Sequence, residues 1–103
     1  MIRHSVHLRF AKTITGADKR ALYDQLASLS GHIDGVLDFQ HRTNVSPESA
    51  VVHGFEDMFW FDFSDETVRN AYLEDKVHKA IGAEIVDMVE GGTDGVFVCD
   101  VEL

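Results

Sequence analysis

The fold is decided by the stretch Asp57–Ile81, whose sequence is DMFWFDFSDETVRNAYLEDKVHKAI. Its first seven residues predict a strand with apolar side chains on both faces, because successive residues of a strand point to opposite sides. The two sets are Phe59, Phe61 and Phe63 on one face, and Met58 and Trp60 on the other. A strand that is apolar on both faces is normally covered on both. In a chain of 103 residues, its own helices can cover one face, so we expect another copy of the chain to cover the second.

The second half of this stretch predicts a helix with an interruption. Ser64 is the expected N-cap, and the two acidic residues after it suit the positive end of the helix dipole. Helical spacing of apolar residues continues to about Glu90, where two glycines end it. A polar run around Asp75 divides the apolar pattern, so we expect two helical pieces that join or kink there.

The rest of the chain supplies three strands and one helix. Alternation of apolar and polar residues predicts strands over 2–10, 36–45 and 95–103, the second weaker and suited to an edge. Thr15 is the expected N-cap of a helix over 16–30, with Asp18 placed to assist it. Residues 46–56 contain the only proline and are typical of a hairpin loop.

The resulting order, strand–helix–strand–strand–helix–strand, predicts a single α+β domain over residues 1–103 with the ferredoxin-like arrangement. Right-handed crossovers place both helices on one face of a four-stranded antiparallel sheet. The other face would expose an apolar patch of a kind that monomers avoid, so we expect it to form a dimer interface. The interface residues we predict are Trp60, Met58, Val96 and Val98.

That same face would also carry polar groups from the first strand if the strand parities match. These are Arg3, Ser5, His7 and Arg9. Charged groups at the centre of an interface need partners, because a buried unpaired charge is costly. The candidate partners are Asp62, Asp100 and Glu102.

Composition narrows the possible functions. The formal net charge is −9, from 18 acidic and 9 basic residues, which argues against binding to nucleic acid or to an anionic membrane surface. No apolar run approaches the roughly 20 residues that a membrane span needs. The chain starts directly in a strand-like pattern without a signal peptide. The one cysteine, Cys99, cannot form an internal disulfide, which fits the cytoplasm.

Several strings, taken in order, resemble the stress-responsive A/B barrel (Dabb) family of dimeric α+β barrels. They are IRHSVHLRF at 2–10, IDGV at 33–36, and AYL at 71–73 followed by VH at 77–78. The resemblance spans essentially the whole chain, with the wider dimeric α+β barrel superfamily as the fallback. It implies a homodimer whose two sheets form a barrel. Most members have no established activity, and a few plant relatives are polyketide cyclases that use a Tyr and a His near the second helix.

By position, His4, Tyr72 and His78 match the polar pocket residues of the family. The chain departs from the family at Asp75–Lys76, where members often have His-Pro, and so it lacks the kink that a proline would impose. It also has Asp57 where a cyclase would carry His. Both departures argue against the plant-type reaction.

The three candidate catalytic residues each have a structural alternative. His4 lies on an apolar face, where a histidine is a core residue or a proton acceptor at neutral pH. Tyr72 lies on the apolar side of its helix, and packing alone could explain it. His78 is six residues further on and reaches Tyr72 only if the helix breaks near Asp75; otherwise it is half-exposed. If the three meet, a neutral His can remove a proton next to a carbonyl while the Tyr hydroxyl donates to the enolate oxygen.

The expected pocket walls suit an apolar or aromatic ligand. They are Phe59, Phe61, Phe63, Leu22, Leu26 and Phe97. No glycine-rich phosphate loop is present, and no cofactor is implied. We expect no metal site, because His4 and His7 point to opposite faces and one cysteine excludes a thiolate cluster. Cys99 is expected to be buried, which argues against a nucleophile.

The sequence therefore predicts a homodimer that binds a small apolar organic molecule. The alternatives are a cyclase or isomerase-like enzyme that uses Tyr and His as acid and base, a monooxygenase relative, and a purely structural role. Polar atoms of His4, Tyr72 and His78 that converge on an open cavity would favour an enzyme.

Overall fold

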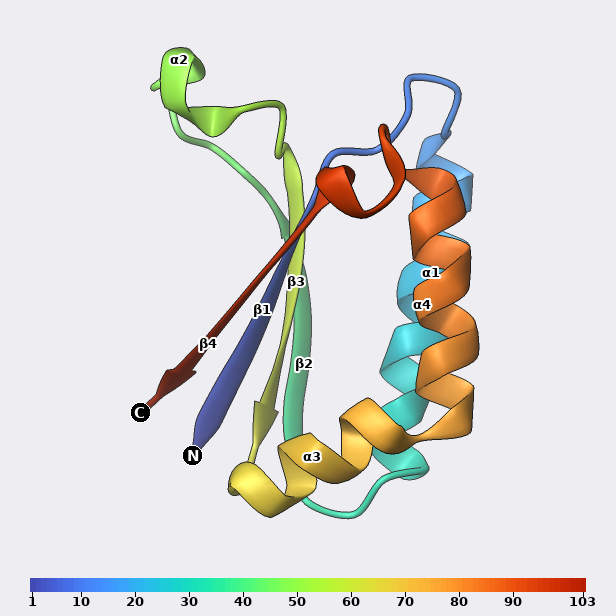
Figure 1. Ribbon diagram of the computed structural model, residues 1–103, viewed down its shortest axis with the longest axis vertical. Helices are drawn as coiled ribbons and strands as arrows, with labels where there is room; N and C mark the ends of the chain where they lie inside the picture. The colour runs from blue at the N-terminus through green and yellow to red at the C-terminus, as the bar shows by residue number, and fades with distance from the viewer.

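The computed structural model describes all 103 residues, and its main elements follow the predicted order (Figure 1). The strands are β1 (Ile2–Leu8), β2 (Val36–Thr43), β3 (Asp57–Phe63) and β4 (Val96–Glu102). The helices are α1 (Gly16–Ser28), α2 (Ser49–Val52), α3 (Glu66–Glu74) and α4 (Lys76–Met88). Two short 3-10 turns are η1 (Leu29–Gly31) and η2 (Gly92–Gly95).

The sheet confirms the ferredoxin-like prediction. All neighbouring strands are antiparallel, in the order β2-β3-β1-β4, so β2 is an edge strand as expected. Figure 1 shows α1 and α4 side by side on one side of the sheet, with α3 joining the end of β3 to them. The opposite face of the sheet carries no long helix, and only the short helix α2 lies at one end of it, where Val51 and Val52 line a hollow with His7 and Phe97.

The core lies between the sheet and these helices. The three phenylalanines of β3 are buried on this side, as the alternation predicts. They pack with side chains from β1, α1 and α3, including Leu8, Leu22, Leu26 and Tyr72. Since full burial of one large apolar side chain contributes about 1.5–3 kcal/mol, this layer is the main source of stability.

The open face of the sheet mixes aromatic and charged groups. Arg3 donates two hydrogen bonds to the buried carboxylate of Asp62, at 2.9 and 3.0 Å, which confirms Asp62 as a partner. The guanidinium groups of Arg3 and Arg42 lie 5.3 and 5.6 Å from the ring centre of Trp60. Cation–π contacts of this kind stabilise the indole on this face.

The predicted faces of β4 are wrong. The register pairs Val6 with Val98 and Leu8 with Val96, and directly paired residues share a face. Val96 and Val98 therefore lie on the helix side and not on the open face. Phe97 lies on the open face beside His7, with 55% of its surface exposed, and not in the helix-side wall. The alternation could not decide this, because both parities of β4 contain apolar residues.

Four smaller expectations also have clear outcomes. Cys99 is exposed on the open face and not buried, for the same reason of register. Thr15 caps α1 in a capping box with Asp18, as predicted. Ser64 is not the cap of α3; Asp65 is, and its carboxylate accepts a hydrogen bond from the Val68 amide at 3.0 Å. The expected hairpin loop contains the short helix α2, for which the sequence offered no periodic signal.

Gly35 is the position where the backbone most needs a glycine. Its φ is +94°, and an added Cβ would lie 2.5 Å from Val68 Cγ2 on α3. Gly35→Ala should therefore lower the free energy of unfolding by about 2–4 kcal/mol, from backbone strain and overpacking together. Urea denaturation measures this loss.

Gly82→Ala is the matched control, because a Cβ at this position in α4 meets nothing within 4 Å. Its free energy of unfolding should stay the same or rise by up to about 1 kcal/mol, since alanine is the better helix former. Equal stability of the two variants would contradict the close approach of Gly35 to α3.

Candidate active site

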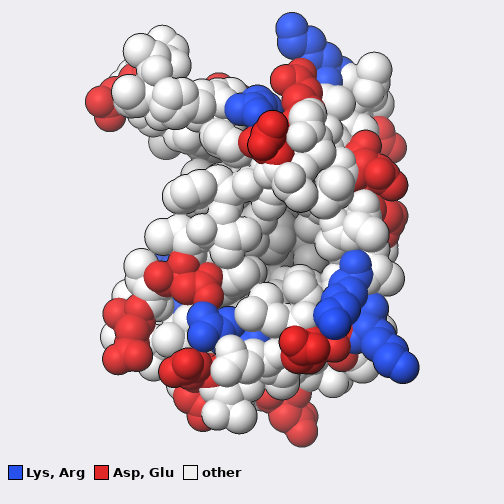
Figure 2. All heavy atoms as spheres, viewed as in Figure 1, with Lys and Arg blue, Asp and Glu red and all other residues white.

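A cavity of about 380 Å³ opens between the sheet and α3–α4. Apolar walls come mainly from the strands and α4, including Val6, Phe59, Ile85, Val86, Val96 and Val98. Its polar side chains are His4, Tyr72, His78 and Thr93. Figure 2 shows this side of the molecule hollowed in the middle, with uncharged atoms inside and charged ones around it. The volume lies within the range of sites for small organic molecules.

Tyr72 and His78 meet because the helix breaks between them. α3 ends at Glu74 and α4 begins at Lys76, while Asp75 between them has an extended backbone with ψ of 131°. On a continuous helix, residues six apart lie about 120° apart around the axis. Here the two ring centres are 3.8 Å apart. The expectation of a break near Asp75 is confirmed, and with it the condition for the two side chains to converge.

The break forms without a proline because Asp75 caps both helices. Its backbone N–H donates to the Tyr72 carbonyl at 3.2 Å, which closes α3. Its carboxylate accepts from the His78 backbone amide at 2.9 Å, which opens α4. An aspartate at an N-cap satisfies amides that would otherwise have no partner.

His4 completes the group from the sheet side. Its ring centre lies 5.4 Å from that of Tyr72, in an edge-on arrangement, and its side chain is buried. Its Nδ1 donates a hydrogen bond to Asp100 Oδ1 at 2.6 Å. Because the carboxylate can only accept, the neutral His4 ring holds its hydrogen on Nδ1 and leaves Nε2 as the acceptor.

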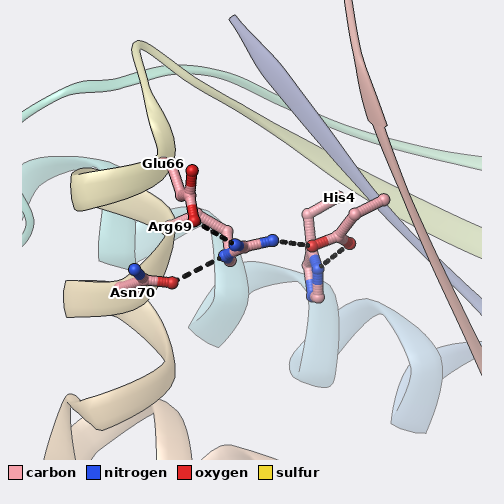
Figure 3. A network of polar contacts seen from close by, with 5 residues as sticks. His4, Glu66, Arg69 and Asn70 are labelled. Atoms are coloured by element: carbon pink, nitrogen blue, oxygen red, sulfur yellow. Dashed lines mark hydrogen bonds and ion pairs between the residues drawn. The ribbon is translucent and has the colours of Figure 1, made fainter.

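Asp100 also pairs with Arg69 of α3, and this network was missed from the sequence. Figure 3 shows His4 and Arg69 reaching the same carboxylate, with Arg69 Nη1 at 2.6 Å from Asp100 Oδ2. Glu66 and Asn70 hold the other side of the guanidinium. Asp100 was expected on the open face, so its contact with His4 followed only from the register of β4.

The protonation states suit proton transfer. Burial lowers the pKa of His4 below 6.5, against the opposing effect of Asp100. Burial also lowers the pKa of His78, and the nearby His4 lowers it further. Burial raises the pKa of Tyr72 above its usual 10, and Asp100 adds to this. At neutral pH the site therefore holds two neutral imidazoles beside a protonated phenol. His78 Nδ1 is buried without a hydrogen-bond partner.

The predicted walls are only partly those observed. Phe59 lines the cavity, but Phe61, Phe63 and Leu26 are fully buried in the core. Leu22 is buried beside a separate surface groove between α1 and α4, and Phe97 lies on the other face of the sheet.

The α4 wall was missed, although the sequence carries a signal for it. Gly82, Ile85 and Val86 follow His78 at intervals of four, seven and eight residues, which is the spacing of one helix face.

No group of three or more His, Cys, Asp or Glu side chains is placed to hold a metal ion. No helix is long and apolar enough to cross a membrane.

The buried histidines predict a pH dependence of stability. In the unfolded chain, these rings bind protons near pH 6.5, whereas burial lowers the pKa of His4, His7 and His78 in the folded protein. As the pH falls below 6.5, the unfolded state binds more protons, so the free energy of unfolding should decrease. Above that pH the stabilisation is complete. Urea denaturation between pH 5 and 8 should show this fall, and His4→Gln should flatten it; an unchanged slope in the variant would exclude His4 as a source.

Comparison with solved structures finds close relatives in fold. A dimeric ferredoxin-like protein of unknown function from Jannaschia sp. CCS1 has 26% identity and a TM-score of 0.85, over 99% of this chain and 98% of that one. The Arabidopsis thaliana protein At3g17210 has 17% identity and a TM-score of 0.87, over 100% and 95%. A hydroxynitrile lyase from Passiflora edulis has 13% identity and a TM-score of 0.82, over 99% and 92%. At such identities the last two share the fold alone.

No curated protein matches the sequence. The sequence profile of the stress responsive A/B barrel domain family, Dabb, matches residues 2–103. The chain thus belongs to the Dabb family, in agreement with its ferredoxin-like fold and with the motifs around His4, Tyr72 and His78.

Proposed function

We propose that this protein is a homodimeric enzyme that moves a proton at the carbon next to a carbonyl group, in a small and largely apolar compound. The observation that carries the proposal is the close contact of the His78 and Tyr72 rings, tilted by 33° to one another, with His4 beside them, at the wall of an open cavity. Three aromatic polar groups from three separate elements converge there. A core that needed only packing would not require this set of residues.

The residues divide the chemistry between them. His78, neutral at neutral pH, accepts the proton from the α-carbon of the substrate. The Tyr72 hydroxyl, held in its protonated form, donates a hydrogen bond to the oxygen that becomes an enolate. His4, oriented by Asp100, presents its Nε2 as a second acceptor. Return of a proton to the same carbon completes an exchange, and return to another carbon completes an isomerisation. In a cyclisation, the enolate carbon instead attacks a second carbonyl carbon of the same molecule, and the protonated His78 returns its proton to the new alkoxide oxygen.

The walls favour a neutral ligand. No Lys, Arg, Asp or Glu side chain lines the cavity, so a charged molecule would lose its hydration without gaining a partner. The apolar residues suit an alkyl or aryl body, and His4, Tyr72 and His78 lie close together, where a carbonyl can meet them. The same cavity supports the second candidate, a ligand-binding protein without catalysis.

The open face of the sheet supports the homodimer. Phe97 and Val101 are 55% and 43% exposed there, on the same face as Trp60. An apolar sheet face of this kind is typical of an interface, and the structures from Jannaschia and Thermobifida fusca are described as dimeric. In the dimer, two such faces would enclose a barrel. The exposed, unpaired Cys99 is consistent with a reducing compartment such as the cytoplasm.

The proposed chemistry predicts catalysed deuterium uptake. In D₂O, the protein should accelerate exchange of the α-protons of phenylacetone, or of related small neutral ketones and aldehydes, as followed by proton NMR. Tyr72→Phe and His78→Gln should each lower the rate by about 100-fold or more, because each removes a proton-transfer partner. Gln25→Ala, an exposed change on α1, should leave it unchanged.

The two candidate functions give different results in this assay. If these ketones and aldehydes shift the NMR signals of cavity residues but their α-protons do not exchange, the result would support binding alone and contradict the enzyme. Exchange that persists in both variants would remove Tyr72 and His78 from the mechanism.

The proposed dimer predicts that a charged substitution on the open face of the sheet yields a monomer or an aggregate. Trp60→Asp should halve the mass measured by light scattering or cause aggregation, because two carboxylates would be buried at a shared surface. Val77→Asp is the matched control, since Val77 is a 47% exposed apolar residue on α4 away from the sheet face. It should remain a dimer. A folded Trp60→Asp dimer would contradict this interface.

A further inference from the structure

The junction between α3 and α4 has a second support besides the cap of Asp75. His32 follows η1, far from this junction in sequence, and its Nε2 donates a hydrogen bond to Asp75 Oδ2 at 2.7 Å. We propose that Asp75 and His32 are positioning residues that hold the His78 ring against Tyr72, in place of a proline. A role of these two residues in catalysis rests on the proposed function. Their role in holding the two rings together does not.

Asp75 uses both carboxylate oxygens for this task. Oδ1 accepts from the His78 amide at 2.9 Å and Oδ2 accepts from His32. The His78 amide belongs to the residue whose ring contacts Tyr72, so the cap fixes the backbone that carries this ring. Without it, the extended ψ of Asp75 would have only weak local support, because Asp75–Lys76 lacks the proline that restricts the backbone.

His32 ties the junction to the first helix. Its backbone N–H donates to the Leu29 carbonyl at 3.1 Å, and Leu29 is fully buried in the core. The imidazole thus reaches Asp75 from a well-anchored turn. This contact links the end of α1 with the α3–α4 junction, two segments that are separated along the chain by the strands β2 and β3.

Electrostatics supports the same arrangement. Hydrogen bonds from the His78 amide and from His32 lower the pKa of Asp75, which keeps its carboxylate ionised. The resulting negative charge opposes the effect of burial on the pKa of His78. Asp75 therefore acts on His78 both through the backbone and through its charge. Lys79 also lies near His78 and has the opposite effect on its pKa.

The test uses four variants and a readout that needs no substrate. Asp75→Ala removes both hydrogen bonds, Asp75→Asn keeps a capping oxygen, and His32→Ala removes only the tie to η1. Thr15→Ala removes the N-cap of α1, at a comparable cost of about 1 kcal/mol, without touching the junction. NMR measures the ring-current shift of the His78 ring protons and their NOEs to the Tyr72 ring.

We expect Asp75→Ala to lose most of the ring-current shift and the NOEs between the two rings. His32→Ala should reduce both, and Asp75→Asn should retain the NOEs because asparagine is also a good cap. Thr15→Ala should keep wild-type values. In the deuterium assay, His32→Ala should lower the rate by about 10-fold, as is typical when a residue that orients a catalytic group is removed.

Wild-type shifts and NOEs in His32→Ala and Asp75→Ala would overturn the proposal, since packing alone would then hold the rings. Loss of the NOEs in Thr15→Ala would also overturn it, because general destabilisation would explain the effect. If Asp75→Ala does not fold, His32→Ala decides the outcome, and wild-type shifts and NOEs in that variant would overturn the proposal. Absence of any catalysed exchange in the native protein would contradict the proposed function and leave the ring measurement unaffected.

Discussion

The structure depends on how Tyr72 packs against the aromatic side chains of β3. Its ring centre lies 5.0 Å from those of both Phe61 and Phe63, and the side chain is almost fully buried. The same ring contacts His78 and His4 on its other sides. One residue therefore anchors α3 to the sheet and forms the floor of the cavity. A rigid core beneath the proposed proton-transfer site keeps its groups in a fixed geometry, which is what general acid–base catalysis requires.

Much of this fold could be predicted from local pattern. The strand β3 and its two faces follow from the alternation of residues 57–63, and β1 follows from an equally clean alternation. The break at Asp75 follows from the polar run that divides two apolar stripes. These signals are local, since they depend only on which side of a helix or strand each residue lies.

The faces of β4 could not be predicted, because Val96, Phe97, Val98 and Val101 place apolar side chains on both parities. The pairing with β1 decides the register, and no local pattern encodes it. This single uncertainty led to the wrong prediction that Cys99 is buried, and it had three further effects. It put Phe97 in the cavity wall and Val98 on the open face, and it separated Asp100 from His4. The phenylalanines of β3 were assigned to the correct face, but the sequence does not say which of them the helices cover completely.

Gly82 lies on the cavity wall, and a side chain at this position would meet no neighbouring atom. The backbone of α4 is therefore bare where it borders the space that a ligand would occupy. A series of larger residues here would narrow the chamber step by step, while the histidines and the tyrosine keep their places. Position 82 thus offers a way to grade the size of molecules that fit this cavity, separately from the groups proposed to transfer a proton.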